Sequence, residues 1–215
     1  MRVFINIKDG QSVHLRQGDL DGACAVYSLM MGLIAAQKVK KNDLMDLAIV
    51  DKVDGRESLG RLIREFFNKI PQSKKEPETV LLRNGYNLAS IQNKLAHSFS
   101  KEAASYYAQC YDENDEESFL DKNQLLQFIT EELDKGYPVE IGCSWKDNGH
   151  ALLAVGYESS HGELTKLFCL DPGYDCPKRT KYNAVISLMR NGRHTQFHEV
   201  MGRRVFIDEA LSIEK

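Results

Sequence analysis

Cys24 stands on a sharp boundary in the sequence, between a polar stretch and an almost unbroken apolar run. In RQGDLDGACAVYSLMMGL (residues 16–33), two glycines and two aspartates precede the cysteine, and mostly apolar side chains follow it. The apolar run predicts a helix that begins near Cys24, and the positive end of a helix dipole stabilises a thiolate. Two roles are therefore open to Cys24: a nucleophile, or a small buried side chain.

His150 belongs to a second distinctive stretch, NGHALLAVGY (residues 148–157). It follows a glycine and begins an alternating apolar pattern, which predicts a place at the exposed start of a strand. A lone histidine in such a place is usually a structural or surface residue. Cys24 lies in the other half of the chain, however, and cysteine–histidine catalysis assembles its pair across such a cleft.

Asp171 ends the next apolar segment, in FCLDPG (residues 168–173). A turn at His161 and Gly162 would make the two segments neighbouring antiparallel strands and bring Asp171 near the level of His150. Its carboxylate would then accept the imidazole Nδ1–H and fix the tautomer of the ring. The alternative is an ordinary turn residue, because aspartate before Pro-Gly is common in turns.

Gln17 lies shortly before Cys24 and carries a side-chain amide that can donate hydrogen bonds. Together with the backbone N–H of Cys24, this amide would form an oxyanion hole that polarises a substrate carbonyl. The alternative is a polar loop residue. Asp19 or Asp21, in the same stretch, would cap the helix through a side-chain oxygen.

The ordered set of Gln17, Cys24, His150 and Asp171 resembles the papain-like cysteine peptidase superfamily. Within it, the chain is most similar to the bacterial peptidases that remove double-glycine leaders from secreted peptides. Those enzymes place a glutamine before the cysteine that starts a helix, a strand that begins with Gly-His, and an Asp-Pro pair on the next strand. The chain differs from their pattern in a longer spacing from glutamine to cysteine, and in Ala25, where glycine or tryptophan is common.

The resemblance implies a hydrolase in which Cys24 is the nucleophile, His150 the base and then the acid, and Asp171 the residue that orients His150. Gln17 and the Cys24 amide would polarise the carbonyl of a peptide or protein substrate, and a thioester would form and be hydrolysed without a cofactor. The same residues also support acyl transfer to an amine or deamidation of glutamine. A catalytically silent peptide-binding module of the same fold is the alternative from another class.

The hydrophobic pattern predicts the elements that position these residues. Helical spacing of apolar side chains predicts helices over 23–39, 41–50, 56–69, 88–100 and 121–135, the last with Gly136 as its C-cap. Alternation predicts strands over 2–7, 12–15, 106–111, 139–145, 151–158, 164–170, 183–189 and 200–207. A polar linker is expected over 71–78, and an acidic loop over 112–118.

This order of elements indicates an α+β fold. The resemblance makes it papain-like, with a helical part at about residues 16–135 and an antiparallel sheet part at about 137–207. The helix that begins at Cys24 is apolar on nearly every side, so it is expected at the centre of the protein. The length favours a single domain over residues 1–215, and nothing in the sequence indicates an oligomeric state.

The composition limits the classes of binding partner and the cellular compartment that are expected for the protein. The 215 residues carry 28 basic and 31 acidic side chains with no basic stripe, which argues against a nucleic-acid partner. No apolar run reaches the roughly 18 residues that cross a membrane, and no signal peptide is predicted. The five cysteines are scattered and odd in number, which predicts reduced thiols in a cytoplasmic protein. Export as an effector by a route without a cleavable signal is the alternative.

The other histidines are alternative candidates for the base. His198 lies in a polar stretch (residues 193–200) and is the reserve candidate. The remaining four are expected to be surface residues at strand ends, helices or turns: His14, His97, His161 and His194. A zinc site at Cys169 and Cys176 has an unusual spacing of ligands and is not expected.

Overall fold

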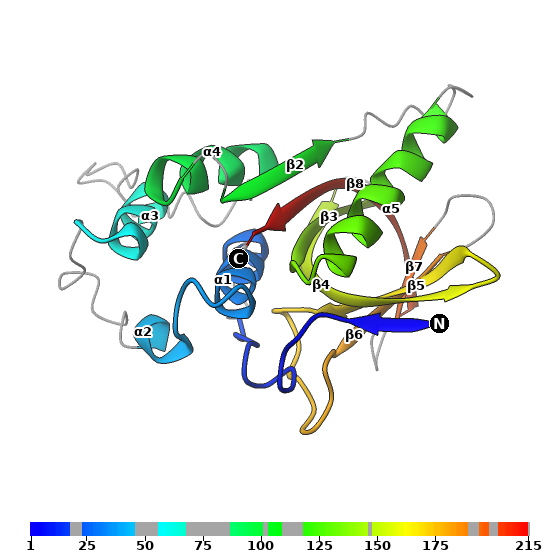
Figure 1. Cartoon of the computed structure of the whole chain (residues 1–215), viewed down its shortest axis with the longest axis horizontal. Coiled ribbons are helices and arrows are strands. Elements are labelled where there is room, and N and C mark those ends of the chain that lie inside the picture. The colour runs from blue at the N-terminus through cyan, green and yellow to red at the C-terminus, as the bar shows by residue number, and fades with distance from the viewer. Residues whose placement is uncertain are drawn as a thin grey trace.

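The computed structural model describes residues 1–17, 23–45, 56–67, 87–100, 103–108, 118–145, 148–188, 194–197 and 202–214 (Figure 1). These residues form an α+β fold, as the sequence predicts. The helices are α1 (Cys24–Ala35), α2 (Lys41–Met45), α3 (Ser58–Phe67), α4 (Leu88–Ser98) and α5 (Ser118–Asp134). The strands are β1 (Arg2–Phe4), β2 (Ala104–Ala108), β3 (Val139–Trp145), β4 (Asn148–Ser160), β5 (Glu163–Leu170), β6 (Ala184–Leu188), β7 (His194–Phe197) and β8 (Gly202–Ile213).

The strands pair antiparallel throughout and close on themselves. From β3 the pairing runs through β4, β5, β6, β7 and β8, and β8 pairs with β3 again. β1 adds to β4, and β2 adds to β8. The sheet is thus larger than the predicted part at 137–207, because β2 supplies partners for residues up to Ile213 at the end of β8. β7 was not predicted from the sequence.

The hairpin between β4 and β5 fixes the register of the two strands, and with it the relative positions of the strand ends near the site. Ser160 pairs with Glu163, so the connection consists of His161 and Gly162, with φ angles of 53° and 84°. A turn with two positive φ angles matches the twist of antiparallel strands. It confirms the prediction that the two segments are adjacent, and Leu170 at the end of β5 lies opposite Leu153 in β4.

Helix α1 is the central helix that the apolar run predicts. Nine of its residues are buried, including Leu29, Met31 and Leu33, which are fully inaccessible to solvent. It packs against β4 and β3, while α4 packs against β2 and β8, and α5 lies over β3, β4 and β8 (Figure 1). The hydroxyl of Ser28 donates to the carbonyl oxygen of Ala151 at 3.1 Å, which fixes the helix against β4.

Local hydrogen bonds explain where the chain departs from the predicted elements. Residues 12–15 form no strand: Ser12 binds Asp9 through its amide and its hydroxyl, and the amide of His14 binds the carbonyl of Gly10, so the chain turns there. Helix α1 ends at Ala35 rather than near 39, because Gln37 adopts a left-handed conformation with φ of 61°.

Other expectations hold or lie outside the described residues. Helix α5 ends at Asp134, and Gly136 follows it as the predicted C-cap glycine, with a φ of 83° that suits glycine and an amide that binds the carbonyl of Leu133. The predicted linker at 71–78 and most of the acidic loop at 112–118 fall outside the described residues. Among the helices of the described part, none is long and apolar enough to cross a membrane.

Gly156 in β4 is where β1 approaches closest. A Cβ atom there would overlap the carbonyl oxygen of Val3 and the ring of Phe4. We expect Gly156→Ala to lower the free energy of unfolding by about 1–3 kcal/mol, because the neighbouring strand would have to move. Urea unfolding measures this change.

Gly149→Ala is the matched control in the same strand. A Cβ atom at Gly149 would meet only the carbonyl oxygen of Cys143, at an ordinary 3.4 Å. Its stability should stay within about 1 kcal/mol of the wild type, since replacing glycine by alanine also reduces the entropy of the unfolded chain. Equal losses in both variants would contradict the assigned packing of β1 on β4.

Candidate active site

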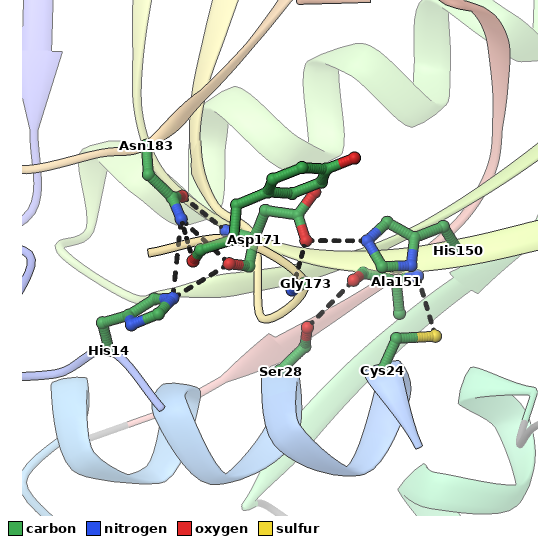
Figure 2. A network of polar contacts seen from close by, with 9 residues as sticks. His14, Cys24, Ser28, His150, Ala151, Asp171, Gly173 and Asn183 are labelled. Atoms are coloured by element: carbon green, nitrogen blue, oxygen red, sulfur yellow. Dashed lines mark hydrogen bonds and ion pairs between the residues drawn. The ribbon is translucent and has the colours of Figure 1, made fainter. Parts of the chain in front are cut away.

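Cys24, His150 and Asp171 come together at the ends of three elements (Figure 2). Cys24 is the first residue of α1, His150 lies near the start of β4, and Asp171 directly follows β5. Nε2 of His150 lies 2.8 Å from Oδ1 of Asp171, and the ring stands between that carboxylate and the Cys24 sulfur. The Asp171 side chain is fully buried, and that of His150 is 19% exposed.

The contact between His150 and Asp171 uses a different ring nitrogen from the predicted one. The sequence-based expectation was that Asp171 accepts the Nδ1–H of His150. In the structure Nε2 faces Asp171, which leaves Nδ1 on the side of Cys24 (Figure 2). The Asp171 carboxylate, held by the amide of Gly173 in the turn after β5, meets the ring on the side away from Cys24.

The start of α1 places hydrogen-bond donors around the Cys24 sulfur. The backbone N–H of Ala151 in β4 lies 3.4 Å from Sγ, and the amide of Ala25 in the first turn of the helix also binds the sulfur. Ala23, at the N-cap position, has no side chain that caps the helix. The predicted caps Asp19 and Asp21 lie outside the described residues. The end of the helix thus faces the sulfur with its own amides, which favours a thiolate.

The thiol and the imidazole shift each other's pKa in opposite directions. Burial alone would disfavour the thiolate, but the hydrogen bond and positive charge of His150, with the amides of Ala151 and Ala25, lower the pKa of Cys24 overall. Burial likewise disfavours the imidazolium, yet the hydrogen bonds and charges of Asp171 and Cys24 raise the pKa of His150 to about 10. The pair therefore favours a thiolate beside an imidazolium at neutral pH.

The other described cysteines have the opposite electrostatics. Burial raises the pKa of Cys143, Cys169 and Cys176, and none of their sulfur atoms contacts a histidine among the described residues. Cys110 lies outside the described residues. Among the thiols that the structure describes, Cys24 is therefore the one whose surroundings promote reactivity.

Gln17 lies beside the turn that carries Asp171. Its backbone N–H donates to the carbonyl oxygen of Pro172 at 2.8 Å, which ties the loop before α1 to the residue after Asp171. Residues 18–22, between Gln17 and the helix, lie outside the described residues. The oxyanion role of Gln17 stays a prediction.

Two residues at the site were not singled out from the sequence. Nε2 of His14 lies 2.9 Å from the carbonyl oxygen of Asp171, and the side chain of Asn183 binds both the amide and the carbonyl of the same residue (Figure 2). His14 was predicted to be a surface residue, but it is 8% exposed. No periodicity marks either residue, because both act through a turn that only the folded chain brings to them.

A reserve base and a zinc site are the other possibilities that the sequence raises. The reserve base His198 lies outside the described residues. Within them, no group of His, Cys, Asp or Glu is arranged to hold a metal ion. Trp145, at the end of β3, packs against the hydrophobic core formed by the sheet and α5.

Comparison with known proteins does not place this chain in a family. No protein-family model matches the sequence, and no curated protein is significantly similar to it. The chemistry of the site therefore has to be derived from its own geometry.

Glu140 in β3 is a buried carboxylic acid near the site. Its side chain is fully buried, and neither oxygen has a hydrogen-bond partner among the described residues. Burial raises the pKa of Glu140 well above its usual value, and the negative charges of Cys24 and Glu209 add to the shift. The raised pKa favours the neutral acid, and a neutral acid places no negative charge beside the Cys24 thiolate.

Replacing Glu140 by the similarly sized apolar Met should stabilise the protein. We expect Glu140→Met to raise the free energy of unfolding at pH 7 by about 1–3 kcal/mol, since an unpaired polar group leaves the core. The gain should grow as the pH rises above about 4.5, because the unfolded wild type then releases a proton that the folded state retains. Urea unfolding at pH 5 and pH 8 measures both effects.

Glu163→Met at the exposed start of β5 is the control, and we expect its stability to stay close to that of the wild type. A loss of stability in Glu140→Met would mean that the Glu140 carboxyl has a strong hydrogen-bond partner in the folded protein.

Proposed function

We propose that the chain is a papain-like cysteine peptidase, folded as a single domain over residues 1–215. One observation carries the proposal: the imidazole of His150 lies between a buried carboxylate and a thiol whose pKa is lowered. Nucleophile, base and orienting residue are the three groups that thiol-dependent acyl transfer needs, and they lie in the required order.

In the proposed reaction the Cys24 thiolate attacks the carbonyl carbon of a peptide bond. The negative charge that develops on the carbonyl oxygen would be bound by the Cys24 amide and by the side chain of Gln17. As the C–N bond breaks, the His150 imidazolium gives its proton to the leaving amine, and a thioester remains on Cys24. His150, now neutral, takes a proton from water, and the hydroxide attacks the thioester to release the acid and the thiolate.

Asp171 acts through His150 and never meets the substrate in this scheme. Its carboxylate stabilises the imidazolium and holds the ring with Nδ1 toward Cys24. A catalytically silent binding module would need neither an activated thiol nor a buried carboxylate behind the histidine, and retaining such a pair costs stability. The combination therefore favours catalysis over peptide binding alone.

The rate of alkylation of Cys24 by iodoacetamide tests the ion pair. At pH 7 we expect Cys24 to react about tenfold or more faster than an ordinary thiol, because its thiolate fraction is raised. The reactivity should persist down to pH values well below the pKa of an ordinary thiol. The ion pair should last until the pH approaches 10, where His150 loses its proton. Peptide mapping by mass spectrometry identifies the labelled cysteine.

His150→Ala should lower the rate of Cys24 alkylation at pH 7 about tenfold. The pH at which that rate rises should move up toward the pKa of an ordinary thiol. Cys176→Ala is the control, because burial raises the pKa of the Cys176 thiol and no histidine among the described residues lowers it. If Cys24 labels no faster than Cys169 or Cys176, the proposed nucleophile is wrong.

Hydrolysis is tested with peptides that contain the double-glycine sequence that the resemblance implies. Mass spectrometry should detect cleavage by the wild type and a loss of at least about a thousandfold in Cys24→Ala. A product joined to an added amine, or a deamidated glutamine, would assign the same site to acyl transfer or deamidation. Binding of the peptides without any covalent change, with Cys24 reactive, would favour the silent module.

A further inference from the structure

The turn that carries Asp171 is held by Asn183, which directly precedes β6. The Asn183 side-chain oxygen accepts from the backbone N–H of Asp171 at 2.7 Å, and its Nδ2 donates to the carbonyl oxygen of Asp171 at 2.9 Å. The same Nδ2 donates to the carbonyl oxygen of Tyr174 at 2.9 Å. One amide side chain thus binds both backbone groups of Asp171 and the end of its turn (Figure 2).

His14 holds the same residue from the opposite end of the chain. Its Nε2 donates to the carbonyl oxygen of Asp171 at 2.9 Å, so the neutral ring must carry its proton on Nε2. Burial lowers the pKa of His14, which keeps the ring in that neutral form. The His14 backbone is itself fixed, because its amide binds Gly10 and its carbonyl accepts from Lys41.

These contacts fix the backbone of Asp171, and the backbone fixes where the carboxylate points. Oδ1 of Asp171 accepts from Nε2 of His150 at 2.8 Å and from the backbone N–H of Gly173 at 2.7 Å. A charge-assisted hydrogen bond depends steeply on distance and angle. A small rotation of the turn would therefore weaken the contact with His150.

We infer that His14 and Asn183 are positioning residues that hold Asp171 in the orientation in which its carboxylate meets His150. The inference rests on the proposed function, because it assigns both residues to the same triad. Neither residue touches the reacting atoms. They act on Cys24 through Asp171 and His150, so their removal should change the reactivity of the thiol as well as the stability of the loop.

A purely structural role is the competing explanation, and the chain offers a matched control for it. Gln11 connects the same two loops: its Nε2 donates to the carbonyl oxygen of Cys176 at 3.1 Å, away from Asp171. Gln11→Leu removes a hydrogen bond between these loops and leaves the Asp171 turn intact. It should destabilise the contact between the loops with no change in the pH profile of Cys24.

The experiment measures the alkylation of Cys24 by iodoacetamide from pH 5 to pH 10 and titrates His150 by NMR. In His14→Phe and Asn183→Leu, we expect the rise of the alkylation profile to move up by about one pH unit, and the His150 titration to move down. His14→Gln, which keeps an N–H donor for Asp171, should recover most of the wild-type profile. Urea unfolding selects conditions in which each variant is folded.

Making His14→Phe and Asn183→Leu in an Asp171→Asn background distinguishes a positioning role of the two residues from a purely structural one. The isosteric amide fills the same space but has no charge, so misplacing it should hardly affect His150. The shifts caused by His14→Phe and Asn183→Leu should therefore shrink to less than half in this background. Equal shifts in both backgrounds, or a shift of the same size in Gln11→Leu, would overturn the inference.

The two readouts keep this inference distinct from the proposed function. If wild-type Cys24 labels slowly, the proposed nucleophile fails, while the His150 titration still reports whether His14 and Asn183 hold Asp171. If Cys24 labels rapidly and neither variant moves the profile or the titration, the proposed function stands and the positioning role is wrong.

Discussion

The carboxylate of Asp171 is completely buried, and a buried carboxylate is tolerated only where hydrogen-bond donors and positive charge replace the lost water. Here the donors are Nε2 of His150 and the amide of Gly173. Much of the surrounding structure serves this one requirement. Strand β4 supplies His150, the β4–β5 hairpin sets its level against Asp171, and the loop at residues 10–17 folds back over the turn.

The buried carboxylate also explains how a thiol can be charged in a partly buried site. Burial by itself would keep Cys24 protonated and His150 neutral, and it is the largest influence on both. The negative charge behind the imidazole reverses this preference by stabilising the imidazolium, which in turn stabilises the thiolate. Helix α1 contributes the amide of Ala25, and β4 contributes that of Ala151. Negative, positive and negative charges thus alternate from Asp171 through His150 to Cys24.

Two acidic residues, Glu140 and Glu209, lie in or beside β3 near these charges. Glu140 is buried without a partner among the described residues, and its neutral form keeps a further negative charge away from the thiolate. Gly142, two residues further along β3, lies against the side chain of Glu209. Glu209 accepts from the amide of Leu88 and so stabilises the start of α4 beside the same face of the sheet.

The sequence by itself determined the α+β class, the places of most helices and strands, and the three residues that meet at the site. Periodicity of apolar side chains carries the class and the elements, because each element must bury one face. The three site residues were predicted instead from their residue types, their neighbours in the sequence and the resemblance that they carry. Only the tertiary structure decided which imidazole nitrogen faces Asp171, that the strand pairing closes through β7, and that His14 and Asn183 hold the turn. These features depend on the direction from which distant segments of the chain approach each other. The pattern of apolar residues in the sequence does not encode that direction.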